Sequence, residues 1–151
     1  MSRLNVVSMS GGKDSTATAV YALETEPHET IRLAFADTGN EHELTYEHIN
    51  YLERELGLPI VRLRADFSDW WWRKREYILT HYAEEGMDEA NLARILSVFD
   101  KGPTGNPYLD LCIIKGRLPS RRAQFCPQYL KTMPLTEYQL SLIEGDVEAV
   151  W

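Results

Sequence analysis

The stretch LNVVSMSGGKDS, residues 4–15, decides the fold expected for this chain of 151 residues. It opens with a short apolar run, Leu4–Ser8, which predicts a buried strand. The Ser/Gly cluster that follows predicts a tight loop. A helix should come next, because Asp14, Ser15 and Thr16 supply capping side chains. Strand, loop and helix in this order are the first unit of an α/β protein.

The pattern repeats through residue 63. The expected first helix carries small and apolar residues that we predict to pack on a sheet: Ala17, Ala19, Val20, Tyr21 and Leu23. Ile31–Ala36 and Ile60–Leu63 predict two further strands. The helix between them is the clearest in the sequence, with an apolar stripe of Leu44, Ile49, Leu52 and Leu56, Gly57 just after its end and Pro59 preventing continuation. This alternation predicts a three-layer, doubly wound, mainly parallel sheet.

The remainder is mostly helical. The expected elements are helices over Trp70–Glu84, Asp88–Phe99, Tyr108–Lys115 and Gln128–Ile143, then a strand beginning at Val147–Trp151. The run Trp70-Trp71-Trp72 cannot face one way on a helix, so at least one ring should be exposed or lie at an interface. Without an internal repeat or a linker, the chain is expected to be one nucleotide-binding domain over residues 1–151.

The net charge is −7, which disfavours non-specific binding to nucleic acid. However, Leu111–Thr136 contains no acid and holds the five cations Lys115, Arg117, Arg121, Arg122 and Lys131. We expect this segment to fold back toward the Gly-rich loop and meet an anionic ligand. The alternative is a surface facing away from the loop that binds a partner or a polyanion.

Several classes of protein are disfavoured. The N-terminus lacks the features of a signal peptide, and no apolar run reaches membrane-spanning length. The spacing of Cys112 and Cys126 fits neither a zinc site nor a thioredoxin-like pair, so both are expected to be reduced thiols in the cytoplasm. Association into a homo-oligomer is left open.

The loop residues suit an anion. Gly11 and Gly12 allow backbone N–H groups to approach a phosphate at the positive end of the helix dipole. Lys13 adds a cation, Ser10 and Ser15 add hydroxyl groups, and Asp14 offers a carboxylate for Mg²⁺ or for helix capping. The loop is not a Walker A motif, because Val7 stands where that motif needs glycine, and it lacks the third glycine of the dinucleotide fingerprint.

Three ordered motifs carry a family resemblance. Ser10–Ser15 looks like the PP-loop of the N-type ATP pyrophosphatases and sulfonucleotide reductases. Phe35–Glu41 with Thr45–Glu47 resembles the Asp-Thr-Gly and Thr-Tyr-Glu block of the phosphoadenosine phosphosulfate (PAPS) reductase family. Phe125-Cys126, Leu130-Lys131 and Pro134-Leu135 resemble the late Cys, Lys and Pro-Leu region of that family.

The resemblance implies a HUP, or adenine nucleotide alpha-hydrolase-like, fold. It implies a small-molecule adenine nucleotide, ATP or PAPS or adenosine phosphosulfate (APS), lying across the carboxyl ends of the strands, together with Mg²⁺. The expected nucleotide-binding residues are Ser8, Ser10, Gly11, Gly12, Lys13, Asp14, Ser15, Ala34, Phe35, Ala36, Asp37, Thr38, Gly39, Arg121 and Arg122. The expected catalytic residues are Lys13, Asp14 and Lys131, and the expected Mg²⁺ ligands are Asp14 and Asp37. For Asp37, a turn-making role competes with a ligand role.

The chain also departs from the family pattern. It lacks the late Glu-Cys-Gly-(Leu/Ile)-His segment that holds the reductase cysteine, and two cysteines cannot supply the four ligands of an iron–sulfur cluster. It stops at Trp151, where relatives usually continue, which indicates either C-terminal truncation or a naturally minimal version. Three functions therefore compete: adenylyl transfer with release of pyrophosphate, sulfonucleotide reduction, and a non-catalytic nucleotide-sensing or partner-binding module.

Overall fold

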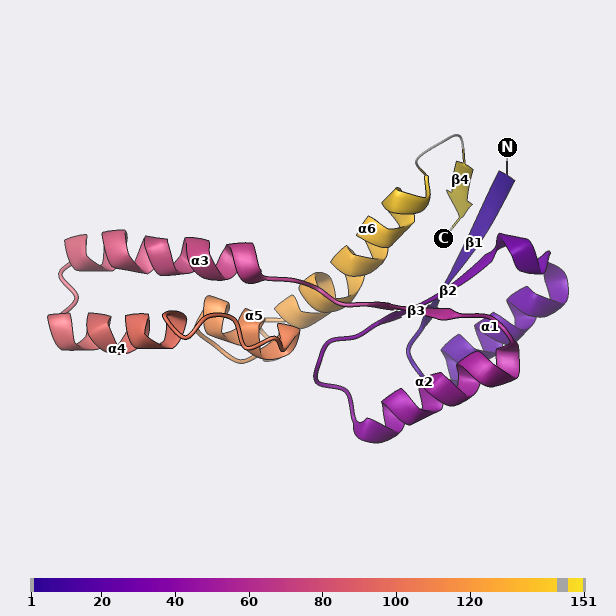
Figure 1. Ribbon diagram of the computed structural model, residues 1–151, viewed down its shortest axis with the longest axis horizontal. Coiled ribbons are helices and arrows are strands. Elements are labelled where there is room, and N and C mark those ends of the chain that lie inside the picture. The colour runs from indigo at the N-terminus through magenta and orange to yellow at the C-terminus, as the bar shows by residue number, and fades with distance from the viewer. Residues whose placement is uncertain (1, 144–146, 151) are drawn as a thin grey trace. The chain divides into compact units, whose positions relative to one another are not determined.

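The computed structural model describes residues 2–143 and 147–150 of the chain (Figure 1). Its internal contacts divide the chain into two compact units. The first joins the chain up to Ala65 with the chain from Phe125 onward, and the second is Asp66–Gln124. That residues 1–151 act as one nucleotide-binding domain stays a prediction.

The first unit is built on a parallel sheet of four strands in the order β3-β2-β1-β4. The strands are β1 (Ser2–Met9), β2 (Ile31–Ala36), β3 (Ile60–Leu63) and β4 (Val147–Val150). The expected strands β2 and β3 have the predicted bounds, and Trp151 of the expected last strand lies outside the described residues. The chain moves from β1 outward to β3 and then crosses to the opposite side of β1. That reversal makes β1 the topological switch point of the sheet.

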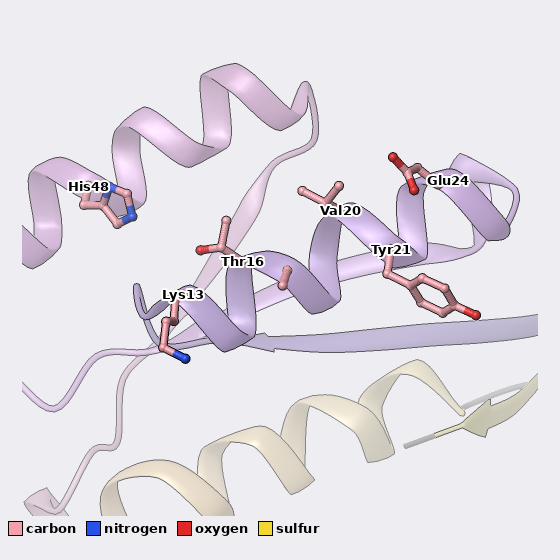
Figure 2. Close-up of a pocket in the computed structure, with 7 residues that line it drawn as sticks. Lys13, Thr16, Val20, Tyr21, Glu24 and His48 are labelled. Carbon is pink, nitrogen blue, oxygen red and sulfur yellow. The ribbon is translucent and has the colours of Figure 1, made fainter.

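Helices cover both faces of this sheet. They are α1 (Lys13–Thr25), α2 (Glu43–Leu56) and α6 (Met133–Leu142), the last preceded by the π-helical segment η3 (Pro127–Thr132). Figure 2 shows α1 and α2 on one side of β1 and α6 on the other. The predicted three-layer, doubly wound α/β architecture is confirmed.

The core between the sheet and its first helices is apolar. Met9, Leu33 and Phe35 on the strands pack with Ile49 and Leu52 of α2. Ala19 and Ala22 let α1 approach the sheet closely, because their side chains are small. Gly57 ends α2 in the left-handed conformation at φ 66°, as the sequence predicted.

Two local expectations are wrong. Asp14, Ser15 and Thr16 do not cap α1, since the helix already begins at Lys13 and its N-cap is Gly12, which has no side chain to accept a hydrogen bond from the first turn. The second expectation is that the apolar residues of α1 and α2 pack on the sheet. Ala19 is buried, but Ala17, Val20 and Tyr21 of α1 and Leu44 of α2 are exposed. These four residues have the right apolar character but stand on sides of their helices that the sheet does not reach.

The second unit is helical. It contains α3 (Ser68–Tyr77), the π-helical segment η2 (Ile78–Tyr82), α4 (Glu89–Phe99) and α5 (Pro107–Lys115). The buried Trp71 ring packs on Phe99, and its indole N–H donates to the Phe99 carbonyl at 2.9 Å. Trp72 is exposed, as expected for one ring of the run. Within the described ranges, no helix is long and apolar enough to cross a membrane.

Candidate functional site

The carboxyl ends of three parallel strands bring three loops to one edge of the sheet. Met9 at the end of β1 pairs with Phe35 of β2, and Ala36 at the end of β2 pairs with Leu63 of β3. The pairing continues one residue further, because the Asp37 N–H donates to the Leu63 carbonyl at 2.8 Å. Neighbouring strands lie about 4.8 Å apart. The β1–α1 loop therefore starts beside Asp37.

Gly11 gives the β1–α1 loop its shape. Its φ of 76° lies in the left-handed region, where a side chain is strained. A Cβ at this position would also lie 3.4 Å from the Thr45 methyl group and 3.9 Å from the His48 ring. Both the backbone conformation and the closeness of α2 thus require glycine here. Gly12 differs, because its φ of −86° suits any residue.

The Ser15 hydroxyl closes the loop. It accepts from the Ser10 N–H and the Ser10 hydroxyl, each at 3.1 Å, and donates to the Gly12 carbonyl at 3.0 Å. The Gly12 N–H in turn donates to the Ser10 hydroxyl at 3.3 Å. These bonds join the end of the strand to the first turn of α1. No side chain among the described residues caps that first turn, so its positive end faces outward.

Lys13 and Asp14 are almost fully exposed. Their side chains form an ion pair at 2.9 Å and are 93% and 92% exposed. A pair as exposed as this contributes little to stability and is easily exchanged for a ligand. Lys13 can therefore turn to a phosphate while Asp14 turns to a cation.

Asp37 is held by several donors. Its Oδ1 accepts from the Tyr46 hydroxyl at 2.7 Å and from the Gly39 N–H at 2.8 Å, and its Oδ2 lies 3.8 Å from the Arg64 guanidinium. Burial, the hydrogen bond to Asp37 and its negative charge raise the pKa of Tyr46. Asp37 thus makes the turn, which is one of its two predicted roles, and its role as a ligand of Mg²⁺ stays a prediction.

Thr38 and Glu41 connect the same turn to η3. The buried Thr38 hydroxyl donates to Glu41 at 2.9 Å, and the Lys131 ammonium lies 3.8 Å from the same Glu41 oxygen. Lys131 is half exposed, so this loose contact leaves it able to move. The predicted role of Lys131 toward an anionic ligand, and the predicted approach of Leu111–Thr136 to the Gly-rich loop, stay predictions.

The remaining predicted residues are placed as follows. Ala34, Phe35 and Ala36 are buried in the central strand β2, and Ser8 faces Ala34 in the neighbouring strand. Their contact with an adenine base stays a prediction. Arg121 and Arg122 belong to the second unit, and their role toward the nucleotide also stays a prediction. Lys115 of that unit lies over the Trp70 ring, 5.8 Å from its centre.

The cysteines lie in different units. Burial raises the pKa of the Cys112 thiol in α5, which keeps it protonated and inert, despite the opposing effect of a hydrogen bond with Tyr108. Cys126 is partly buried at the start of η3. Among the described residues, no group of three or more His, Cys, Asp or Glu side chains could hold a metal ion by itself.

Sequence reasoning gave no role to Tyr46, Glu41 and Arg64. The first two stand in a quoted motif, and Arg64 follows β3 directly, so each could have been found by asking which polar residues adjoin a strand end. Together with Asp37 they form a polar network at the carboxyl edge of the sheet. The network positions the turn beside the β1–α1 loop.

A Gly-rich loop that joins the switch-point strand to an uncapped helix defines a Rossmann-like α/β protein, and loops of this geometry suit an anion. The chain belongs to the phosphoadenosine phosphosulfate reductase domain family, whose model matches residues 4–96. The β1–α1 loop is the PP-loop of this nucleotide-related family.

Three curated relatives are similar to the chain. An uncharacterized 37.8 kDa protein of Escherichia phage 186 is 42% identical over 140 residues, which are 86% of this chain and 40% of that protein. An uncharacterized protein of Methanocaldococcus jannaschii is 38% identical over 72 residues, 48% of this chain and 14% of that protein. An uncharacterized nin region protein of Escherichia phage lambda is 25% identical over 137 residues, 89% of this chain and 42% of that protein. The chain thus spans less than half the length of these relatives. No solved structure matches it.

The Asp37–Tyr46 bond predicts a stability difference that depends on pH. Near neutral pH, Tyr46→Phe should lower the free energy of unfolding by about 1–3 kcal/mol, because a partly buried carboxylate loses a donor. Since the folded-state pKa of Tyr46 is raised, its contribution is complete below about pH 10, the ordinary tyrosine value, and is lost as pH rises through the folded value. Urea unfolding at several pH values should show the two proteins converging at alkaline pH.

Tyr51→Phe is the matched control on the same helix, because the Tyr51 ring is 48% exposed. It should unfold like the parent. A Tyr46→Phe protein as stable as the parent at neutral pH would show that the bond does not hold the turn.

Proposed function

We propose that the chain binds an adenine nucleotide with its phosphates on the PP-loop and, with Mg²⁺, transfers the adenylyl group to an acceptor while pyrophosphate leaves. The observation that carries this proposal is the uncapped first turn of α1. The loop before it turns at Gly11, which has a positive φ, and is held in shape by the hydrogen bond from the Ser10 N–H to the Ser15 hydroxyl. Backbone N–H groups there lie at the positive end of a 13-residue helix. Family membership supports a nucleotide as the anion.

The reaction needs positioning and neutralisation of charge more than it needs a nucleophile from the protein. An oxygen of the acceptor forms a bond to the α-phosphorus, the bond from that phosphorus to the β-phosphate oxygen breaks, and the acceptor proton passes to solvent. The PP-loop N–H groups and Lys13 would stabilise the negative charge on the departing pyrophosphate. Lys131, held loosely by Glu41, would approach the transferring group.

The carboxylates fit a magnesium ion bound chiefly by phosphates. Mg²⁺ in nucleotide sites usually takes one or two carboxylates and keeps phosphate and water oxygens as its other ligands. Asp14 offers an exposed carboxylate, and Asp37 offers the oxygen that Tyr46 and Gly39 do not occupy. When bound, the ion would neutralise phosphate charge.

Since both cysteines are free thiols, we place this activity in the cytoplasm.

Sulfonucleotide reduction is the second candidate, favoured by the family whose model matches the chain. In that reaction a thiolate attacks the sulfur of PAPS, an S–S bond forms, the S–O bond breaks, and the adenosine bisphosphate leaves. A reduced thioredoxin then releases sulfite by supplying two electrons. Cys126 is the thiol that the motif pattern places, but the family's late cysteine segment does not occur in this sequence.

Removing the Lys13 cation should weaken nucleotide binding without unfolding the chain. We expect Lys13→Ala to bind ATP roughly ten- to a hundredfold more weakly, because one charge-assisted phosphate contact is lost. Gly12→Val should have a similar effect: its φ accepts a side chain, which would stand where the phosphate approaches. Calorimetry with ATP, AMP, APS and PAPS, with and without Mg²⁺, measures both variants.

Lys101→Ala, which removes an exposed lysine of the second unit, is the control and should bind like the parent. If folded Lys13→Ala and Gly12→Val proteins bind every nucleotide as tightly as the parent does, the PP-loop is not the phosphate site.

The two chemical candidates differ in their products. We expect the 151-residue chain, given PAPS and reduced thioredoxin, to release no sulfite. Sulfite release that Cys126→Ser abolishes would instead establish reduction as an activity of this chain. Adenylyl transfer could then not be its only reaction.

A further inference from the structure

The solvent side of α1 is unusual for a surface helix. The residues that line a hollow of about 590 Å³ along it are Lys13, Thr16, Ala17, Val20, Tyr21 and Glu24, with His48 from α2 (Figure 2). Between Lys13 and Glu24 this side carries no charge, although an outward helix face is normally charged or polar. Val20 and Tyr21 are 40% and 67% exposed. An apolar outward side of this kind indicates that another surface covers it.

The apolar area extends onto α2. Leu44, His48 and Tyr51 follow one another at helical spacing, so they share one side of that helix. His48 lines the hollow, and its ring stacks on Tyr51 with the centroids 6.0 Å apart. Leu44 and Tyr51 are 64% and 48% exposed. We call Ala17, Val20, Tyr21, Leu44, His48 and Tyr51 the α1–α2 patch.

The order of residues along α1 indicates what covers the patch. The lining residues are arranged symmetrically about a point between Thr18 and Ala19, so that Lys13 corresponds to Glu24, Thr16 to Tyr21 and Ala17 to Val20. Each of these pairs is complementary: a cation with an anion, or a small side chain with a larger one. A two-fold axis through that point would set α1 antiparallel to α1 of a second copy and bring every pair together. Lys13 and Glu24 are about 16 Å apart along the helix, so both pairs of charges would flank the apolar contact.

We propose that the α1–α2 patch is a two-fold interface between two copies of this chain. The order of charge and side-chain size along α1 is complementary to itself. This favours a second copy of the chain, because binding an unrelated partner would not require such self-complementarity. The interface goes beyond the proposed function, and it borders the PP-loop because Lys13 belongs to both. A partner carboxylate from Glu24 then lies beside Lys13 in the dimer, so nucleotide phosphate and the second copy meet at the same ammonium group.

Sedimentation velocity of the full chain without nucleotide tests the interface. The parent should show a monomer–dimer equilibrium, and Val20→Glu should weaken association at least about tenfold, since two new negative charges would join the two Glu24 carboxylates beside the two-fold axis. Val98→Glu is the matched control, because Val98 of α4 is also 40% exposed. It should associate like the parent.

A charge exchange tests the proposed pairing itself. Glu24→Lys should weaken the dimer by placing lysine against Lys13, and Lys13→Glu/Glu24→Lys should restore it by recreating the pair in the opposite sense. Circular dichroism confirms that each protein is folded. A parent that stays monomeric at every concentration, a Val20→Glu protein that dimerises like the parent, or a double variant no better than Glu24→Lys would overturn the proposal. Nucleotide binding is measured separately, by calorimetry of the parent, so failure of the interface and failure of the proposed function are distinguishable.

Discussion

Parallel pairing of β1 with β2 is the constraint on which the site depends. Five consecutive residues of β1, Asn5–Met9, pair in register with Ile31–Phe35, and this register fixes where both strands end. A slip of one residue would turn every side chain of a strand to the opposite face, so the buried Met9, Leu33 and Phe35 hold the register. The Gly-rich loop and the Asp37 turn are therefore neighbours because the core requires it.

The loop itself is shaped by local contacts. Gly11 provides a backbone conformation that other residues avoid, and the Ser15 hydroxyl bonds backward to Ser10 and does not cap the helix. As a result, the first turn of α1 keeps its N–H groups available to a ligand. Around it, the cations Lys13, Arg64 and Lys131 are each paired with a carboxylate, in contacts of 2.9 to 3.8 Å. An anion arriving at this edge would meet positive groups that are already near and only loosely held.

Much of this arrangement could be predicted from the sequence. The bounds of β2 and β3 follow from short apolar runs bordered by turn residues, and Gly57 and Pro59 mark the end of α2. Helical periodicity was less informative about which side of a helix faces the sheet. Ala17, Val20 and Leu44 have the spacing of residues on a buried side, yet they are exposed. Spacing identifies which residues share a side, whereas only the packed sheet determines which side is covered. The bond of Tyr46 to Asp37 and the approach of Lys131 to Glu41 join residues nine and ninety positions apart, and no local pattern encodes such contacts.

The central claim is that phosphate is bound by the backbone at the start of α1. The most direct test is a titration of the ¹⁵N-labelled chain with ATP and Mg²⁺, followed through the backbone amide resonances. We expect the largest changes at Gly11, Gly12, Lys13 and Asp14, and smaller changes at these residues with AMP, which lacks the pyrophosphate group. Saturable changes confined to other residues, with the amides of these four unmoved, would contradict this claim.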